Sequence, residues 1–137
     1  MTVTAKSITG YQIEIDTGSH QFIIDEPVSK GGDDAGPTPY DTLLAALAGC
    51  KAITVQMYAR RKGWLLEKVI LTLQHSKIHA DDCEDCDGGA VGKIDIIDVD
   101  ISFEGDLSEE QLKRLKEISN RCPVHKTLIT ETKIRTK

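Results

Sequence analysis

The chain has 137 residues, of which 39% are hydrophobic and 28% are charged, and its formal net charge is −5. This length suits one domain with its own hydrophobic core, so we expect a single domain over residues 1–137. The negative charge and the lack of a lysine- or arginine-rich block argue against nucleic acid or an anionic membrane as a partner. We find no apolar leader and no run of 18 apolar residues, and therefore expect a cytoplasmic protein.

The first predicted elements are short strands. In the stretch YQIEIDTGSHQFIID, residues 11–25, apolar side chains alternate on both sides of a Thr17-Gly18 turn. This period of two predicts a β-hairpin. The next segment, EPVSKGGDDAGPTP, is rich in Gly, Pro and Asp, and such a composition predicts an exposed loop.

A long helix is predicted next, in YDTLLAALAGCKAITVQMYARRKGW, residues 40–64. Its apolar stripe at helical spacing consists of Leu43, Leu47, Cys50, Thr54 and Met57. Between Leu43 and Tyr58 the strongly polar side chains are Lys51 and Gln56 alone, so we expect this helix to be central and buried. Gly63 is well placed to end it.

Two strands are predicted in the second half of the chain. EKVILTLQHSKIH, residues 67–79, places Val69, Leu71 and Leu73 on one face. In KIDIIDVDISFEG, residues 93–105, the alternation changes phase at Ile96-Ile97, which predicts a β-bulge there.

Two helices and a strand should complete the chain. In LSEEQLKRLKEIS, residues 107–119, Ser108 and Gln111 form a capping-box signature, with Leu112, Leu115 and Ile118 on the buried face. Cys122 precedes Pro123, a pattern typical of an N-cap before a short helix. TETKIRTK at the end is compatible with an edge strand. Strands, a buried helix, then strands and helices indicate an α+β fold.

The four cysteines, Cys50, Cys83, Cys86 and Cys122, are expected to be free, catalytic or metal-bound in a reducing compartment. A thiol at a helix N-terminus tends to have a lowered pKa, and a shift of about two units would raise its ionised fraction at pH 7 from roughly 3% to about three quarters. Cys50 and Cys122 each have a second interpretation as a small buried hydrophobic residue. His125 could pair with a thiolate or be a solvated surface histidine, and the pattern leaves these alternatives open.

Two segments, GPTPYDTLLAALAGCKAITVQMYARRKGW and NRCPVHKTL, together resemble the OsmC/Ohr family of osmotically inducible and organic-hydroperoxide-resistance proteins. The resemblance implies an α+β intertwined homodimer with antiparallel sheets packed on a long central buried helix. It also implies a thiol peroxidase without a cofactor, in which Cys50 attacks a small-molecule hydroperoxide and becomes a sulfenic acid. Cys122 would then form a disulfide with Cys50, and a dithiol reductant would reopen it.

One part of the family pattern is missing from this chain. The peroxidases activate the first cysteine with an N-terminal arginine paired with a glutamate ten residues before that cysteine. Here Tyr40 occupies the glutamate position, and no arginine precedes Arg60. The candidates for the missing cation are Lys30, Lys51, Arg60 and Arg121, or one of these residues from a partner chain, and the sequence does not select one.

A second cysteine motif lies in HSKIHADDCEDCDGG, residues 75–89. His79, Cys83 and Cys86 have a spacing compatible with zinc ligands. The acidic residues around the two thiols should raise their pKa values, which favours metal binding over redox catalysis. A solvated acidic loop and a reversible disulfide remain as alternatives.

Three functions are therefore compatible with the sequence. The first is peroxide reduction through Cys50 and Cys122. The second is a non-enzymatic OsmC-like protein that binds a small ligand or senses oxidation without turnover. The third is metal binding through His79, Cys83 and Cys86.

Overall fold

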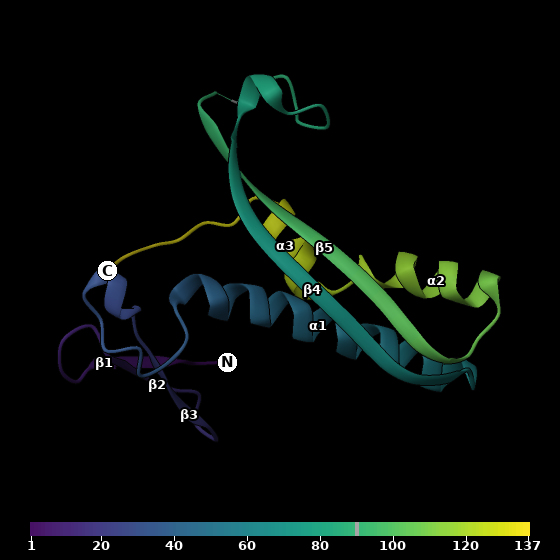
Figure 1. Ribbon diagram of the computed structural model, residues 1–137, viewed down its shortest axis with the longest axis horizontal. Helices are drawn as coiled ribbons and strands as arrows, with labels where there is room; N and C mark the ends of the chain where they lie inside the picture. The colour runs from purple at the N-terminus through teal and green to yellow at the C-terminus, as the bar shows by residue number, and fades with distance from the viewer. Residues whose placement is uncertain (90) are drawn as a thin grey trace. The chain divides into compact units, whose positions relative to one another are not determined.

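The computed structural model describes residues 1–89 and 91–137. These residues form two compact units, Met1–Ala45 and Ala46–Lys137, which are described separately here. Figure 1 shows the order of the elements along the chain by colour.

The first unit contains a three-stranded antiparallel sheet. Its strands are β1 (Thr4–Ser7), β2 (Ile13–Asp16) and β3 (Gln21–Ile24), in that spatial order. The predicted hairpin is confirmed, because Ile15 pairs with Phe22 across a turn in which Gly18 has a φ of 92°. Such a positive φ favours glycine.

The loop after β3 is organised by one buried carboxylate. Asp25 is 1% exposed, and its side chain accepts hydrogen bonds from the N–H groups of Glu26, Asp33 and Ala35. Together these bonds lower the pKa of Asp25, and the bond from the Ala35 N–H has the largest effect. The loop contains a short 3₁₀ turn, η1 (Val28–Lys30), and is mostly exposed as predicted.

Helix α1 (Pro39–Lys62) begins and ends at recognisable caps. At its start, the Asp41 carboxylate accepts hydrogen bonds from the N–H and the hydroxyl of Thr38, at 3.0 and 2.8 Å. At its end, Gly63 has a φ of 69°, which confirms the predicted stop. The Thr38 hydroxyl oxygen in turn accepts a hydrogen bond from the N–H of Asp41 at 3.1 Å, so Thr38 caps the helix and Asp41 completes the reciprocal pair.

The buried stripe of α1 differs from the predicted one. The buried residues are Leu47, Lys51, Val55 and Ala59. Leu43 and Met57 of the predicted stripe are 36% and 65% exposed, so the prediction of a helix buried over most of its surface is wrong for the single chain. Helix α1 is apolar on several sides. Hydrophobic periodicity alone therefore could not predict which side packs against the rest of the second unit.

A long antiparallel hairpin follows α1. It consists of β4 (Leu65–His79) and β5 (Lys93–Asp106), and Val69, Leu71 and Leu73 lie on the partly buried face as predicted. The predicted bulge at Ile96-Ile97 is wrong, because these residues pair regularly with Ser76 and His75. The register shift lies at the other end, between Leu66 and Lys68.

The absence of a bulge at Ile96-Ile97 has a simple reason. Both residues are half-buried although they lie on opposite faces of the hairpin. Figure 1 shows that the distal half of the hairpin, which ends near the turn η2 (Ala80–Asp82), extends beyond α1 and beyond α2 (Glu109–Ser119). A ribbon that no helix covers is not required to keep its apolar side chains on one face.

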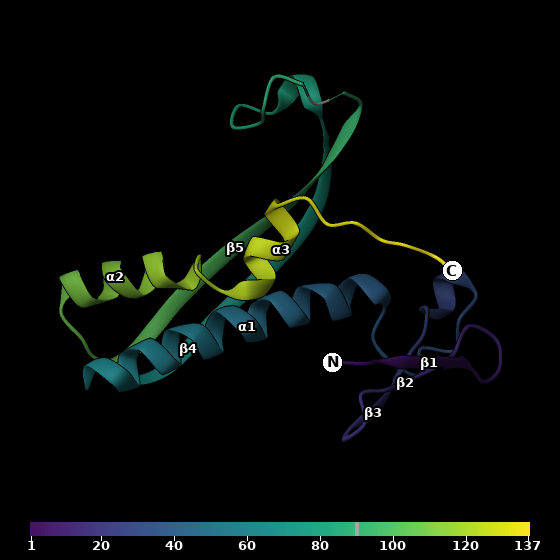
Figure 2. The same cartoon turned by 180° about the vertical axis from the view of Figure 1, so that it is seen from behind.

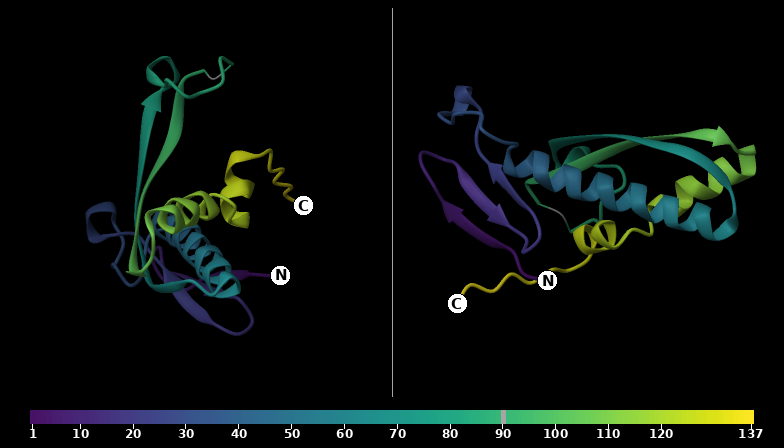
Figure 3. Two further views of the ribbon diagram at one scale, coloured as in Figure 1. Left: turned by 90° about the vertical axis from the view of Figure 1, so that its right-hand side faces the viewer. Right: turned by 90° about the horizontal axis from the view of Figure 1, so that it is seen from below.

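Two helices, α2 (Glu109–Ser119) and α3 (Pro123–Ile129), complete the second unit. The Ser108–Gln111 capping box is confirmed, with both side chain to backbone bonds present. The core is formed by Val55 and Ala59 of α1 with Leu115 and Ile118 of α2. Side chains of the hairpin pack against this cluster, and Figure 3 shows both helices on the same side of the ribbon.

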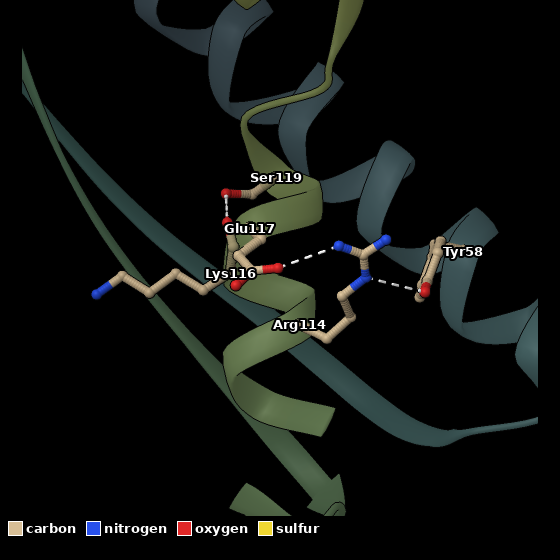
Figure 4. Close-up of polar contacts among 5 residues, drawn as sticks. All are labelled: Tyr58, Arg114, Lys116, Glu117 and Ser119. Carbon is tan, nitrogen blue, oxygen red and sulfur yellow. Dashed lines mark hydrogen bonds and ion pairs between the residues drawn. The ribbon is translucent and has the colours of Figure 1, made fainter. Parts of the chain in front are cut away.

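A polar contact also joins α1 to α2. The Nε of Arg114 donates a hydrogen bond to the hydroxyl of Tyr58 at 3.2 Å, and its Nη1 donates to Glu117 at 3.1 Å (Figure 4). This hydrogen bond is the main reason why the pKa of Tyr58 is lowered.

The predicted C-terminal strand is wrong. Residues 131–137 follow α3 without entering a helix or a strand, and Figure 2 shows this segment leaving α3 as an extended chain. A strand is stabilised by hydrogen bonds to a neighbouring strand. No strand among the described residues pairs with the segment 131–137.

Candidate thiol site

Cys50 lies in the middle of α1 and has a free, half-buried thiol. Its carbonyl accepts a hydrogen bond from the hydroxyl of Thr54, at 2.8 Å, one turn later in the helix. The stripe of fully buried residues passes through its neighbour Lys51. The Cys50 thiol therefore remains partly accessible from outside the chain.

Cys122 occupies the N-cap of α3, as predicted from the proline that follows it. Its φ of −65° and ψ of 141° are extended, as expected for a residue before proline. The thiol is free and fully buried, and its sulfur accepts a hydrogen bond from the N–H of His125 at 3.2 Å.

The predicted lowering of the Cys122 pKa is wrong. Burial raises the pKa of this thiol, and the neighbouring Cys50 side chain raises it further through a hydrogen bond and through charge repulsion. The His125 N–H and the charge of Lys51 act in the opposite direction but do not prevail. Desolvation of a thiolate in this buried position outweighs the stabilisation expected at a helix N-terminus.

Because the Cys50 side chain acts on the pKa of Cys122, the two thiols are neighbours in the folded chain. They come from different elements, α1 and the start of α3, which are far apart in the sequence. Figure 2 shows α3 beside the middle of α1, at the end of the turn that leaves α2. The fold thus brings together the two thiols to which the sequence resemblance assigned roles.

A buried lysine lies at the same place. Lys51 is 1% exposed, and its Nζ is 3.2 Å from the carbonyl oxygen of Ser119 and 3.1 Å from Oδ1 of Asn120. A third contact, of 3.0 Å, joins this Nζ to Nδ1 of His125. Burial lowers the pKa of Lys51, whereas the charges of the Cys122 and Cys50 thiolates would raise it.

His125 is part of this arrangement and not a solvated surface residue. Its ring is half-buried, and burial, together with the charge of Lys51, lowers its pKa. A neutral ring leaves Nδ1 available to accept a hydrogen bond from Lys51 when the ring proton is on Nε2. His125 contacts Lys51 with its side chain and Cys122 with its main chain.

Four cations were candidates from the sequence. Of these, Lys51 is the one whose charge acts on the Cys122 thiol within the second unit. Arg60 and Arg121 belong to the same unit but have exposed side chains. Lys30 belongs to the first unit, in η1. The contacts of Asn120 and Ser119 with Lys51 were missed in the sequence analysis, and the only available signal was a charged residue on an otherwise apolar helix.

The CxxC loop forms a separate cluster at the tip of the hairpin. Cys83 and Cys86 are joined by a disulfide, and their Cα atoms are 5.5 Å apart. The potential ligand atoms that cluster here are those of Cys83, Asp85 and Cys86, within 4.8 Å of one another, so His79 is not part of the group. The disulfide occupies the two sulfurs that a metal would need in their thiolate form.

A sequence profile of OsmC-like proteins matches residues 31–137. The chain belongs to the OsmC-like family. This match covers the helix that carries Cys50 and the whole of the second unit. No curated protein matches the chain.

Solved structures agree with this OsmC-like fold. An OsmC-like protein from Mycoplasma pneumoniae is 24% identical, with 93% of this chain and 85% of the other covered and a TM-score of 0.71. An organic hydroperoxide resistance protein from Legionella pneumophila is 19% identical, with 94% and 90% covered and a TM-score of 0.65. The organic hydroperoxide resistance protein OhrB of Bacillus subtilis is also 19% identical, with 94% and 91% covered and a TM-score of 0.64. At these identities the likeness establishes the α+β fold with antiparallel sheets and a central helix.

Proposed function

We propose that this OsmC-like protein reduces organic hydroperoxides through Cys50 and Cys122. The observation that carries the proposal is that two free thiols, on α1 and at the N-cap of α3, are close enough for Cys50 to raise the pKa of Cys122. The proposal is also supported by the structural neighbours from L. pneumophila and B. subtilis, which are named organic hydroperoxide resistance proteins.

The reaction begins at the partly accessible thiol. The Cys50 thiolate attacks one oxygen of the hydroperoxide ROOH, the O–O bond breaks, and the alkoxide leaves as the alcohol ROH after it takes up a proton. Cys50 is thereby oxidised to a sulfenic acid. Because Cys50 is half-buried and Cys122 is fully buried, Cys50 is the thiol better placed to meet a substrate.

Cys122 completes the cycle from within the protein. Its sulfur attacks the Cys50 sulfenic acid, an S–S bond forms, and the hydroxyl group leaves as water with the proton of the Cys122 thiol. A dithiol reductant then reduces this disulfide to two thiols and is itself oxidised to a disulfide. Burial of Cys122 protects it from direct oxidation and reserves it for this second step.

The test is peptide mapping by mass spectrometry after the reduced protein is treated with one equivalent of cumene hydroperoxide. We expect a Cys50–Cys122 disulfide in the wild type and none in Cys50→Ser. In Cys122→Ser we expect a Cys50 sulfenic acid that dimedone traps. Reduced Cys50 and Cys122 after this treatment would contradict the proposal.

We also propose that the protein acts as a cytoplasmic homodimer. Apolar side chains of the second unit remain exposed in the single chain, among them Ile53 at 58% and Met57 at 65% on α1. Helix α1 is apolar enough for a membrane span by length and composition, with a mean hydropathy of 1.3 over an 18-residue window. Its central Lys51, however, is bound to the end of α2, to Asn120 in the following turn and to α3. A second copy of the chain is therefore the better cover for these side chains.

Light scattering on a size-exclusion column tests this assembly. Substitution of Met57→Glu, which places a charge among the exposed apolar residues, should halve the molar mass of the wild-type particle. Gln56→Glu is the matched control, because Gln56 is the exposed polar neighbour of Met57, and its particle should keep the wild-type mass. A wild-type protein with the mass of one chain would overturn this part of the proposal.

A further inference from the structure

The three polar contacts of Lys51 match the donors of a lysine ammonium group. An ammonium group has three N–H donors and no acceptor. Three acceptors surround the Lys51 Nζ, namely the Ser119 carbonyl, Asn120 Oδ1 and, with the proton on Nε2, His125 Nδ1. The charged form of Lys51 is therefore fully hydrogen-bonded inside the protein.

Hydrogen bonds alone do not balance the charge of this ammonium group. Isolated charges are rarely buried without a counter-ion. Among the described residues, no ion pair joins a carboxylate to Lys51. The titratable groups near it are the thiol of Cys50, on its own helix, the thiol of Cys122, at the N-cap of α3, and the ring of His125, within α3. A thiolate is the only one of these that supplies a negative charge.

The thiols have the complementary requirement. A buried thiolate needs a nearby cation, and Lys51 is the cation that lowers the pKa of Cys122. Burial favours the neutral forms of both partners, whereas their mutual attraction favours the charged pair. Groups coupled in this way release their protons as a unit and not independently.

We propose that Lys51 is the counter-cation of the Cys50–Cys122 pair, held in place by Ser119, Asn120 and His125. Its role in turnover rests on the proposed function. Because Lys51 directly follows Cys50 on α1, the charge that makes the thiol nucleophilic is supplied by the cysteine's own helix. His125 and Asn120 are positioning residues, since they act on the thiols through Lys51.

The first experiment measures thiol ionisation without a peroxide. In a Cys83→Ser/Cys86→Ser background, Cys50 and Cys122 are the remaining thiols. Their rates of alkylation by iodoacetamide are followed from acid to alkaline pH, with peptide mapping to separate the two sites. Lys51→Met, which has a similar length and no charge, should react at least about tenfold more slowly at pH 7, since each pKa unit changes the thiolate fraction by about tenfold.

The pH profile distinguishes this role from a structural one. As the pH rises beyond the ordinary thiol range, the rates of Lys51→Met should approach those of the wild type, because the thiols then ionise without help. Lys113→Met, which removes an exposed lysine from α2, should reproduce the wild-type profile. A folded Lys51→Met protein with the wild-type profile would overturn the proposal.

A second experiment leaves Lys51 in place and is useful if Lys51→Met does not fold. The titration of the Lys51 ammonium group is followed by NMR in the wild type and in Cys50→Ser/Cys122→Ser. We expect its pKa to fall when the thiols are removed, because their negative charge no longer favours the ammonium form. An unchanged pKa would contradict the coupling between lysine and thiols.

These outcomes are independent of the test of the proposed function. If hydroperoxide fails to produce the Cys50–Cys122 disulfide in the wild type, the peroxidase function is wrong, but the alkylation profiles still report on Lys51. If the disulfide forms rapidly and Lys51→Met has the wild-type profile, the peroxidase function stands and the counter-cation is wrong.

Discussion

The Nζ of Lys51 lies 3.0 Å from Nδ1 of His125, and this contact joins the middle of α1 to the helix that begins at Cys122. The main-chain N–H of the same histidine donates a hydrogen bond to the Cys122 sulfur. His125 therefore links the buried cation to one of the two thiols. The environment that keeps this ring neutral also makes the stability of the site depend on pH.

We predict that acid destabilises the wild type more than the variant His125→Asn. The pKa of His125 is lowered in the folded protein from its ordinary value of 6.5, by burial and by the charge of Lys51. As the pH falls below 6.5, the unfolded chain binds a proton that the folded chain does not, so stability is lost. Asparagine retains an acceptor for Lys51 but does not titrate.

Urea unfolding near pH 7.5 and pH 5.5 measures this difference. The loss in free energy of unfolding between these two values should be smaller in His125→Asn than in the wild type. His20→Asn is the control, because His20 is an exposed residue of the β2–β3 turn, and its loss should equal that of the wild type. An equal loss in His125→Asn would show that the ring does not carry the pH dependence.

The contact between Tyr58 and Arg114 leads to a second prediction. The hydrogen bond from Arg114 lowers the pKa of Tyr58 from its ordinary value of 10.0, and the charge of Arg114 also contributes (Figure 4). Arg114→Gln should therefore raise the pKa of Tyr58 towards 10.0. We would follow tyrosinate absorbance in a background that lacks the other two tyrosines, Tyr11 and Tyr40.

The matched control for this titration is Lys113→Gln, which removes a neighbouring positive charge from an exposed position on the same helix. Its titration midpoint should lie close to that of the parent protein. If Arg114→Gln and Lys113→Gln shift the midpoint equally, a general loss of positive charge, and not the hydrogen bond, would account for the effect.

Local rules were sufficient to predict several elements from the sequence. The capping box of Ser108 and Gln111 depends on residues three positions apart, and the stop at Gly63 depends on a positive φ that favours glycine. The N-cap conformation of Cys122 follows from the proline beside it. In each case the bonding partners or steric constraints lie within one helical turn.

The centre of the site could not be predicted by the same rules. The partners of Lys51 are Ser119, Asn120 and His125, which come close to it only after α2 and α3 pack against α1. The raised pKa of Cys122 likewise depends on its burial and on Cys50, and neither is visible from the helix start alone. The sequence resemblance paired the two thiols, whereas only the packed structure shows that Lys51 lies near them.

Packing of α2 against α1 leads to a third prediction. Leu115 is 0% exposed and lies at the centre of the core cluster with Val55 and Ile118. Leu115→Ala should lower the free energy of unfolding by about 2–5 kcal/mol, because it leaves a cavity between the helices and the hairpin. Lys116→Ala, at the next and exposed position, should change it by less than about 0.5 kcal/mol. Similar losses in both variants, measured by urea unfolding, would contradict this account of the core.

The CxxC loop provides the last prediction. The disulfide between Cys83 and Cys86 closes a loop with a sequence separation of only 3 residues, so its entropic contribution to stability should not exceed about 2 kcal/mol. The loop lies at the tip of the hairpin, whereas the thiol site lies on α1 and α3 (Figure 1). Cys83→Ser/Cys86→Ser should therefore form the Cys50–Cys122 disulfide at the wild-type rate after addition of cumene hydroperoxide.

Rapid-quench alkylation followed by peptide mapping measures that rate. Its control is Cys122→Ser with the CxxC loop intact, which should accumulate oxidised Cys50 without a Cys50–Cys122 disulfide. If the loop variant slows the formation of this disulfide severalfold while it remains folded, the two cysteine pairs exchange electrons. In that case the loop belongs to the redox pathway, and the acidic residues around it do not prevent thiol exchange.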